Sequence, residues 1–452
     1  MNNLTMNELV ITSVDDHIVE PPNMFQKRLP DDVEQPRIVE DEEGNQMWRW
    51  DDLVSTNMGL NAVVGRPKEE WGMEPSRFEH MREGTWQVDA RVDDMNAAGM
   101  FAAINFPSFT RYGKLFVERA KTDPGNAYRV LQAYNDWHID EWCGAHPGRF
   151  IPMAAMPYWD PELCVQEIKR VNAKGVHALA FTDNPTVMGC PSIHRDIWEP
   201  VWQICDELSM VLNCHIGSGG YPNHPSMESP INSWITGMPI AIANSAADWI
   251  NLQAFQRFPN LKMALSEGSI GWIPYLLERA DFTQSHHGPW TNMSYGGKKP
   301  SDIFREHIYT CYIEDHFGLE NRHNIGVDNI CYEVDYPHSD CVWPNVPEMV
   351  WAAFERLGDI TDEEINKITH ANAHNLYSFD GMEKVGGREH CTVGALRAQA
   401  GHVQTEPVSM PGYAPKGYTP GKVVTSGDIV GLFDDDEDGD VKEMGTAAMA
   451  KG

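Results

Sequence analysis

Carboxylate and imidazole side chains stand at the ends of short apolar runs at several places in the sequence. The first run ends in Asp15-Asp16-His17, and because side chains alternate along a strand, Asp15 and His17 would face the same way. Two imidazoles and several carboxylates form a donor set that suits Zn²⁺, or alternatively Mn²⁺ or Fe²⁺, better than a thiolate-loving metal. The two imidazoles are those of His17 and His215, and the carboxylates are those of Asp15, Glu267 and Asp335. His338 follows the last run, three residues after Asp335.

Each of these residues also has a simpler interpretation. An Asp-x-His pair such as Asp15 and His17 occurs in ordinary surface turns, and His215 alone is compatible with a hydrogen-bonded core histidine. Asp335 precedes Tyr336-Pro337, and an aspartate in this position is often a turn residue. The metal interpretation depends on all of them lying at the ends of predicted strands, because catalytic groups of a barrel gather at the C-terminal ends of its strands.

Eight apolar runs alternate with stretches of helical period, which predicts an α/β protein with a parallel sheet. Eight strands favour a closed (β/α)8 TIM barrel over an open doubly wound sheet, and no G-x-G-x-x-G follows the first strand. The predicted strands are Val10–Asp15, Phe101–Phe106, Phe150–Met156, Val176–Phe181, Met210–His215, Leu261–Glu267, Ile308–Ile313 and Asn329–Asp335. The main predicted helices are Val88–Gly99, Asn126–Trp142, Pro161–Ala173, His194–Leu208, Ile240–Phe258 and Trp272–Arg279.

Three segments fall outside this rhythm. Residues 21–86 follow the first strand and are predicted to form an insertion over the active-site mouth, and Gly217–Trp234 is predicted to be a long loop. We expect residues 1–380 to form the barrel, and 381–452 to form an extended or partly disordered C-terminal arm with an acidic end at residues 434–440. Such an arm could wrap a neighbouring subunit in a homo-oligomer with exchanged arms. A flexible terminus explains the composition equally well.

The composition excludes several classes of function. The formal charge of −31 repels phosphate backbones and anionic lipid, so neither a nucleic acid nor a membrane is an expected partner. The nine cysteines are scattered and include no C-x-x-C pair, which indicates free thiols in a reducing compartment. We therefore expect a cytoplasmic protein that acts on a small molecule.

The stretch from Val14 to Pro22, Val-Asp-Asp-His-Ile-Val-Glu-Pro-Pro, resembles the opening metal motif of the amidohydrolase-related (amidohydrolase 2) proteins. The similar branch contains aminocarboxymuconate-semialdehyde and resorcylate-type decarboxylases. The other stretches that resemble it are residues 89–95, 335–338 and 368–377. The resemblance implies a metal-dependent TIM barrel, in which one divalent ion is held by Asp15, His17, His215 and Asp335.

One residue departs from this pattern. Many members of the family carry a histidine at the end of the sixth strand, where this chain has Glu267. A carboxylate there disfavours a substrate carboxylate in the same pocket, which argues against decarboxylation. Glu267 also has a purely structural interpretation as the cap of a helix that starts near Gly268.

The leading hypothesis is a hydrolase of a small organic substrate, in which metal-activated water attacks a carbonyl-type carbon. Asp335 would take up and return the proton, while Glu267 and His338 would position the substrate or shuttle protons. The alternative is a non-oxidative decarboxylase of an aromatic or unsaturated acid, and the third hypothesis is a metal-stabilised binding protein without turnover. The tryptophans that could line an apolar pocket are Trp48, Trp50, Trp71, Trp86, Trp234 and Trp343.

Overall fold

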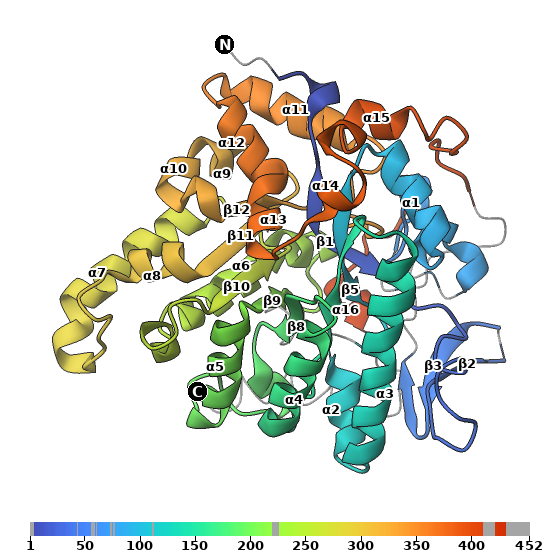
Figure 1. Cartoon of the computed structure of the whole chain (residues 1–452), viewed down its shortest axis with the longest axis horizontal. Coiled ribbons are helices and arrows are strands. Elements are labelled where there is room, and N and C mark those ends of the chain that lie inside the picture. The colour runs from blue at the N-terminus through green and yellow to red at the C-terminus, as the bar shows by residue number, and fades with distance from the viewer. Residues whose placement is uncertain are drawn as a thin grey trace.

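Parallel strands and helices alternate around a barrel in the computed structural model (Figure 1). The residues that it describes are 4–42, 44–55, 59, 61–72, 75, 77–110, 113–218, 226–409 and 421–430. The barrel strands are β1 (Thr12–Ile18), β5 (Ala102–Pro107), β6 (Phe150–Ile151), β7 (Met153–Ala154), β8 (Ala178–Thr182), β9 (Val211–His215), β10 (Lys262–Ser266), β11 (Ile308–Tyr312) and β12 (Ile330–Tyr332). Neighbours pair in parallel in the orders β1-β5-β6 and β7-β8-β9-β10-β11-β12, and only Pro152 separates β6 from β7.

Hydrogen bonds between β1 and the chain that follows β12 close the barrel. The backbone N–H of His17 donates to Tyr336 O at 2.6 Å, and the N–H of Asp335 donates to Asp15 O at 2.7 Å. These bonds place the ends of the first and last strands side by side. The predicted TIM barrel is confirmed, with β6 and β7 counting as one interrupted strand.

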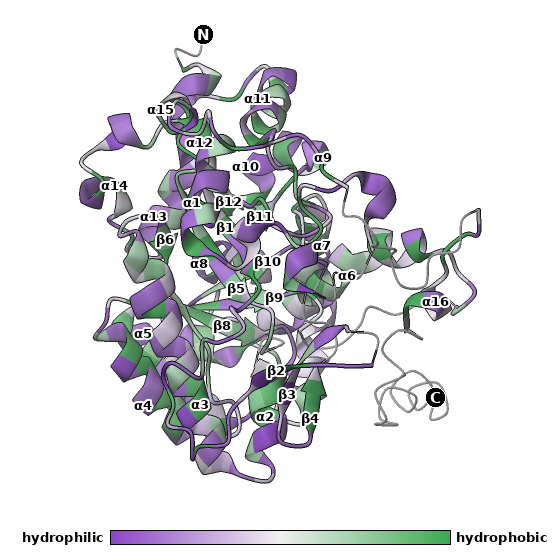
Figure 2. Cartoon of the chain, turned by 90° about the vertical axis from the view of Figure 1, so that its right-hand side faces the viewer, coloured by the Kyte–Doolittle hydropathy of each residue, from purple (hydrophilic) through white to green (hydrophobic). Residues whose placement is uncertain are grey.

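Apolar side chains fill both the inside of the barrel and the layer beneath the helices. Alternate residues of each strand point inward, as Ile104 and Phe106 do on β5 and Ala178 and Ala180 on β8. Figure 2 shows apolar strands surrounded by helices with mixed polar and apolar surfaces. The main helices are α1 (Val88–Ala97), α2 (Lys114–Ala120), α3 (Pro124–Trp137), α4 (Pro161–Asn172), α5 (Glu199–Leu208), α6 (Ile231–Trp249), α7 (Ile273–Thr291), α8 (Pro300–His307) and α11 (Val346–Leu357). Within the described ranges, no helix is long and apolar enough to cross a membrane.

The segment after β1 contains a small antiparallel sheet of β2 (Arg37–Glu40), β3 (Gln46–Trp50) and β4 (Leu53–Ser55). Residues further along this segment return to the barrel, where the N–H groups of Val63 and Val64 both donate to Pro337 O at 3.0 Å. This contact joins the segment to the loop after β12, which carries Asp335 and His338.

The α6 helix starts earlier than the sequence predicts. It begins at Ile231, within the segment 217–234 that was predicted to be a loop, and it contains Pro239. Gly237 and Pro239 disfavour a helix locally, but Trp234 and Ile242 are buried on this helix. Burial of these large side chains outweighs the local preference. Residues 219–225 of the predicted loop lie outside the described part of the chain.

The residues after 380 include folded structure packed on the barrel. The short helices α14 (Gly381–Lys384) and α15 (Val393–Arg397) lie next to the start of the chain, and Val393 N–H donates to Leu9 O at 2.8 Å. Val393 and Leu396 are buried. Further along, α16 (Ser426–Val430) packs against α6. The acidic end predicted at residues 434–440 lies outside the described residues.

Candidate metal centre and substrate cavity

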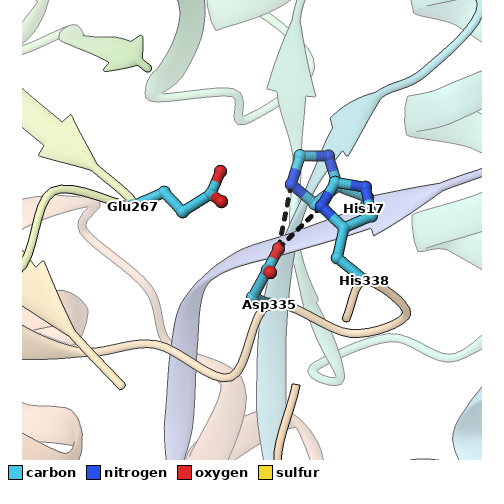
Figure 3. Close-up of side chains that lie close together, drawn as sticks. All are labelled: His17, Glu267, Asp335 and His338. Carbon is cyan, nitrogen blue, oxygen red and sulfur yellow. Dashed lines mark ion pairs between the residues drawn. The ribbon is translucent and has the colours of Figure 1, made fainter. Parts of the chain in front are cut away.

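The predicted site residues converge at one end of the barrel, where β1, β9 and β10 end and the chain leaves β12. Figure 3 shows Glu267 and the ring of His17 on opposite sides of the Asp335 carboxylate, with His338 beside His17. Donor atoms of His17, Glu267, Asp335 and His338 all lie within 4.8 Å of one another, and those of Asp15, His17 and His215 do the same. The two groups share His17, so they form one cluster.

The donor atoms are spaced as neighbouring ligands of one ion would be. His17 Nε2 lies 3.1 Å from His215 Nε2, 3.2 Å from Asp335 Oδ1 and 3.5 Å from Asp15 Oδ1. His215 Nε2 lies 3.5 Å from Asp15 Oδ2 and 3.0 Å from Glu267 Oε2. Bonds of about 2.1 Å to a first-row divalent ion separate adjacent ligand atoms by about 3 Å. The residues present therefore fit a divalent metal ion.

Buried charge supports the same conclusion. Both carboxylate oxygens of Asp15 are buried and accept no hydrogen bond from the described residues, and the Asp335 carboxylate is buried beside the rings of His17 and His338. Burial raises the pKa of Asp15 well above its usual value, and the nearby Glu333 and Asp335 carboxylates raise it further. Burial, together with His338 and His215, lowers the pKa of His17 well below its usual value. Neutral imidazoles keep their lone pairs, and a cation would compensate the carboxylates.

A hydrogen bond orients the ring of His215. Its Nδ1 lies 2.7 Å from the carbonyl oxygen of Ile216, which can only accept, so Nδ1 carries the proton. Nε2 then presents its lone pair to His17 and Asp15. Bonds of this kind between a ring N–H and a backbone carbonyl are common among metal-binding histidines.

Glu267 follows β10 directly and faces the cluster rather than a helix. Its backbone adopts a φ of 58°, and that of Asp335 a φ of 59°, which is uncommon for residues other than glycine. The Glu267 N–H donates to Glu333 Oε2 at 3.0 Å, and the Cys311 thiol donates to the same oxygen at 2.6 Å. The next helix starts only at Ile273, with Trp272 as its N-cap, so Glu267 does not cap it.

Glu333 is a residue of the site for which no role was predicted from the sequence. It is buried, and its carboxylate fixes the backbone of Glu267 through the bond described above. Burial raises the pKa of Glu333 to about 8, and Cys311 opposes this rise. The signal was available, because Glu333 and Asp335 both lie in the predicted strand Asn329–Asp335, two residues apart, where side chains point toward the same side.

His338 stacks on the ring of His17 with centroids 3.7 Å apart, and its Nδ1 lies 3.0 Å from Asp335 Oδ1. Burial lowers the pKa of His338, but the Asp335 and Glu267 carboxylates outweigh it, so that the net pKa is raised. His338 and Asp335 both line the cavity described below. Their contact offers a path for a proton between the cavity and Asp335.

Asp16 points away from this cluster into a second polar network. Its Oδ1 accepts a hydrogen bond from the Ser13 hydroxyl at 2.7 Å, and its Oδ2 lies 3.9 Å from Arg91 Nη1. Arg91 also donates to His17 O at 2.5 Å and lies 4.2 Å above the Tyr336 ring. The stretch 89–95, which resembles a family motif, thus holds the backbone of the site from outside.

A cavity of about 740 Å³ opens above Glu267, Glu333, Asp335 and His338. Arg66, which is 3% exposed, and the more exposed Lys68 contribute positive charge to its lining. Aromatic and other apolar side chains in the lining include Trp71, Trp234, Trp343, Met238, Met349 and Ile216. Arg66 was not predicted as a site residue, because it belongs to the long segment after β1, whose path does not follow from strand alternation or barrel order.

Several other residues considered from the sequence lie away from the cavity. Trp48 and Trp50 are buried in the core of the segment after β1, and Trp86 packs against Phe78. Asn213 lies inside the barrel, where its Oδ1 accepts a hydrogen bond from the Tyr377 hydroxyl at 2.5 Å. Of the six tryptophans, three therefore line the cavity.

A model of the amidohydrolase family matches residues 70–379. Gamma-resorcylate decarboxylase of Rhizobium radiobacter is 25% identical over 322 residues, which cover 65% of this chain and 88% of the relative. An amidohydrolase from Mycobacterium avium subsp. paratuberculosis K-10 has a similar fold, with a TM-score of 0.62 and 20% identity over 81% of this chain and 99% of that one.

A dihydroxybenzoic acid decarboxylase from Polaromonas sp. JS666, solved with bound manganese and the inhibitor 2-nitroresorcinol, also shares the fold. Its TM-score is 0.54, with 19% identity over 85% of this chain and 100% of that one. The prediction of an enzyme is confirmed, since these relatives are enzymes. The prediction of a hydrolase is wrong, because the curated relatives are decarboxylases. The prediction of a hydrolase relied on the negative charge of Glu267. The charge of one residue does not show where a substrate carboxylate would lie.

Proposed function

Because the chain belongs to the amidohydrolase family, we propose that it is a metal-dependent, non-oxidative decarboxylase of a hydroxylated aromatic acid. One observation carries the proposal. The buried Asp335 carboxylate lines a cavity that also contains tryptophans and Arg66. Through His17 it is joined to the buried carboxylate of Asp15, which accepts no hydrogen bond from the described residues. The similarity to gamma-resorcylate decarboxylases indicates the class of reaction.

Asp15, His17, His215 and Asp335 would hold one divalent ion. The carboxylate share of this donor set favours Mn²⁺ over Zn²⁺, and a neighbour of the same fold holds manganese. Such an ion, when bound, withdraws charge from the oxygens of the substrate. Burial within the chain favours the neutral imidazole of His17, and the hydrogen bond from His215 to Ile216 O orients the His215 ring.

Asp335 would donate a proton to the ring carbon that carries the carboxylate. The bond between that carbon and the carboxylate then breaks, its electron pair returns to the ring, and CO2 leaves. The ring gains one C–H bond for each C–C bond lost, so the step needs no oxidant. His338, 3.0 Å from Asp335 and in the cavity lining, would restore the proton to Asp335.

Glu267 would face the hydroxyl of the substrate. Glu267 lines the cavity, and its side chain is 18% exposed, whereas those of Asp15, His17 and Asp335 are fully buried. A carboxylate can accept a hydrogen bond or a proton from a phenolic hydroxyl. The negative charge of Glu267 is then compatible with an acidic substrate, whose carboxylate lies elsewhere in the cavity.

The walls of the cavity would select the substrate. The Arg66 guanidinium is a planar cation suited to a carboxylate or another anionic group on the ring. Trp71, Trp234 and Trp343 offer flat apolar surfaces for the ring itself. A cavity of about 740 Å³ is large enough for one substituted aromatic ring.

The direct test is to load the purified protein with Mn²⁺ and supply gamma-resorcylate and other mono- and dihydroxybenzoic acids. We expect CO2 and the corresponding phenol in equal amounts, measured by gas detection and chromatography. His215→Ala, loaded in the same way, is the control and should give neither product. Turnover of an ester or lactone without CO2 release from any acid would contradict the proposal.

A further inference from the structure

Residues near the C-terminus contribute to the cavity although they lie beyond the family match, which ends at residue 379. Thr405 and Pro407 are part of the cavity lining. They follow the short helix α15, whose Arg397 side chain donates two hydrogen bonds to the Glu348 carboxylate, at 2.5 and 2.8 Å. We name residues 405–409 the C-terminal wall.

The C-terminal wall is attached to the segment that carries Arg66. The N–H of Val408 donates to the carbonyl of Gly65 at 2.9 Å. Gly65 adopts a φ of 79° and directly precedes Arg66, and the neighbouring Val64 N–H donates to Pro337 O. A short run of backbone contacts thus connects the C-terminal wall, the Arg66 segment and the loop that bears Asp335 and His338.

A second attachment reaches the other side of the cavity. Residues 424–427 run beside residues 227–231, and the bonds are Ile231 N–H to Val424 O at 2.9 Å, Ser426 N–H to Ser229 O at 2.8 Å and Gly427 N–H to Met227 O at 2.8 Å. The α6 helix begins at this point and carries Trp234 and Met238 into the cavity lining. In Figure 2, α16 lies on the same side as α6, away from α14.

We propose that the C-terminal wall determines substrate access and specificity in this enzyme. Thr405 and Pro407 line the cavity, and the bond from the Val408 N–H to Gly65 O attaches this part of the chain to the Arg66 segment. Further along the chain, residues 424–427 are attached to the start of α6. The Thr405 hydroxyl offers a hydrogen bond to a ring substituent, and Pro407 offers an apolar contact. The wall acts on the end of the substrate that is remote from the predicted metal ligands.

Cys341 allows this proposal to be tested without knowing the substrate. It lines the same cavity, and it alone among the nine cysteines is not buried. The aromatic disulfide reagent 5,5′-dithiobis(2-nitrobenzoate) is bulky and anionic, whereas iodoacetamide is small. The rate at which each modifies Cys341, followed by peptide mass spectrometry on the full-length protein, reports how far the mouth is open.

The variant pair Val408→Pro and Val408→Ala isolates the first attachment. Proline removes the N–H that donates to Gly65, while alanine keeps it, and the Val408 side chain is 46% exposed. We expect Val408→Pro to increase the rate at which the bulky reagent modifies Cys341 at least about fivefold. The rate of Cys341 modification by iodoacetamide should change less than about twofold. Val408→Ala should match the parent. Unchanged melting temperature and metal content would show that the variants are folded.

The pair Ser426→Pro and Ser426→Ala tests the second attachment in the same way. Proline is tolerated at the first residue of α16 but cannot donate to Ser229. Parent-like rates in both proline variants would overturn the proposal, as would equal acceleration in Val408→Ala. If the rate of Cys341 modification fell as the protein concentration rose, a second copy of the chain would be covering the cavity. This result would also contradict the proposal.

A kinetic measurement deepens the inference and depends on the proposed function. With gamma-resorcylate, Val408→Pro should raise KM about fivefold and leave kcat within about twofold, because the wall binds the substrate away from the reacting carbon. A fall in kcat without a change in KM would contradict this role. If no acid is turned over, the Cys341 rates still decide whether the wall closes the cavity, so failure of the two proposals can be distinguished.

Discussion

The base and the walls of the cavity are built in different ways. The base consists of residues at or just beyond the C-terminal ends of barrel strands, such as His215, the last residue of β9, and Glu267, directly after β10. The walls come from the segment after β1, from α6 and from residues beyond 400, which are far apart in the sequence. The base is therefore determined by strand register, whereas the walls depend on long-range contacts.

This difference separates chemistry from selectivity. The base places carboxylates and imidazoles at 3.0 to 3.5 Å from one another with fully buried ligand side chains, which suits a fixed reaction centre. The walls combine Arg66, Lys68, three tryptophans and the C-terminal wall around a cavity that is open to solvent. We expect changes in the base to abolish the reaction and changes in the walls to alter which acid is used.

The largest effect is expected at the base. His215→Ala should remove one nitrogen ligand and leave the carboxylates of Asp15 and Glu267 facing each other, so that metal content falls below about a tenth of the parent and kcat falls at least about 10³-fold. Elemental analysis and CO2 release measure the two effects. The matched control is His286→Ala on the exposed surface of α7, which should change neither. Retention of metal by His215→Ala would remove this residue from the proposed ligand set.

Glu267 lies at the boundary between base and cavity and should show a smaller effect. Glu267→Gln keeps the shape of the side chain but weakens its ability to accept a proton, so we expect kcat/KM to fall about 100-fold with the metal retained. Steady-state kinetics with elemental analysis of the same samples would check both parts. Glu314→Gln, at an exposed cavity-lining carboxylate, should stay within about twofold of the parent. Loss of metal from Glu267→Gln would instead identify Glu267 as a ligand.

Arg66 tests the walls directly. Arg66→Met retains length and apolar volume but removes the charge, so we expect KM for an aromatic acid to rise about tenfold with kcat nearly unchanged. Lys68→Met removes a charge from a more exposed position in the same lining and should have a weaker effect. If the Arg66 variant lost kcat and kept its KM, the division between base and walls would fail at this residue.

The smallest effect concerns stability where the base meets the segment after β1. Glu20 is fully buried, its oxygens accept the N–H groups of Ser108 and Phe109, and burial raises its pKa to about 7. Because the folded state holds this proton and the unfolded state releases it above pH 4.5, stability should fall between pH 4.5 and 7 by at most about 3 kcal/mol. Glu20→Gln should flatten this part of the pH profile, which denaturant titrations at pH 5, 6, 7 and 8 would reveal. An equally steep profile in the variant would assign the dependence to other groups.

The sequence predicts the base far better than the walls. Alternation along β1 correctly directs Asp15 and His17 toward one side and Asp16 to the other, and barrel order brings His215, Glu267 and Asp335 to the same end. Neither pattern could locate Arg66, whose place depends on backbone contacts to Pro337. The start of α6 was also missed, because burial of Trp234 outweighs the local effect of Gly237 and Pro239. The role of residues 381–452 in a homo-oligomer with exchanged arms stays a prediction.

In the proposed reaction, the base of the cavity carries out decarboxylation by protonation at carbon. The most direct measurement is to let the Mn²⁺-loaded enzyme react with carboxyl-¹³C-labelled gamma-resorcylate in D2O. The metal ion is then removed with a chelator, and the products are identified by NMR. We predict one ¹³CO2 released and one deuteron incorporated at the vacated ring carbon for every turnover, with no product from His215→Ala. Labelled carbon that remains in an organic product, or CO2 release at the same rate in His215→Ala, would contradict the account.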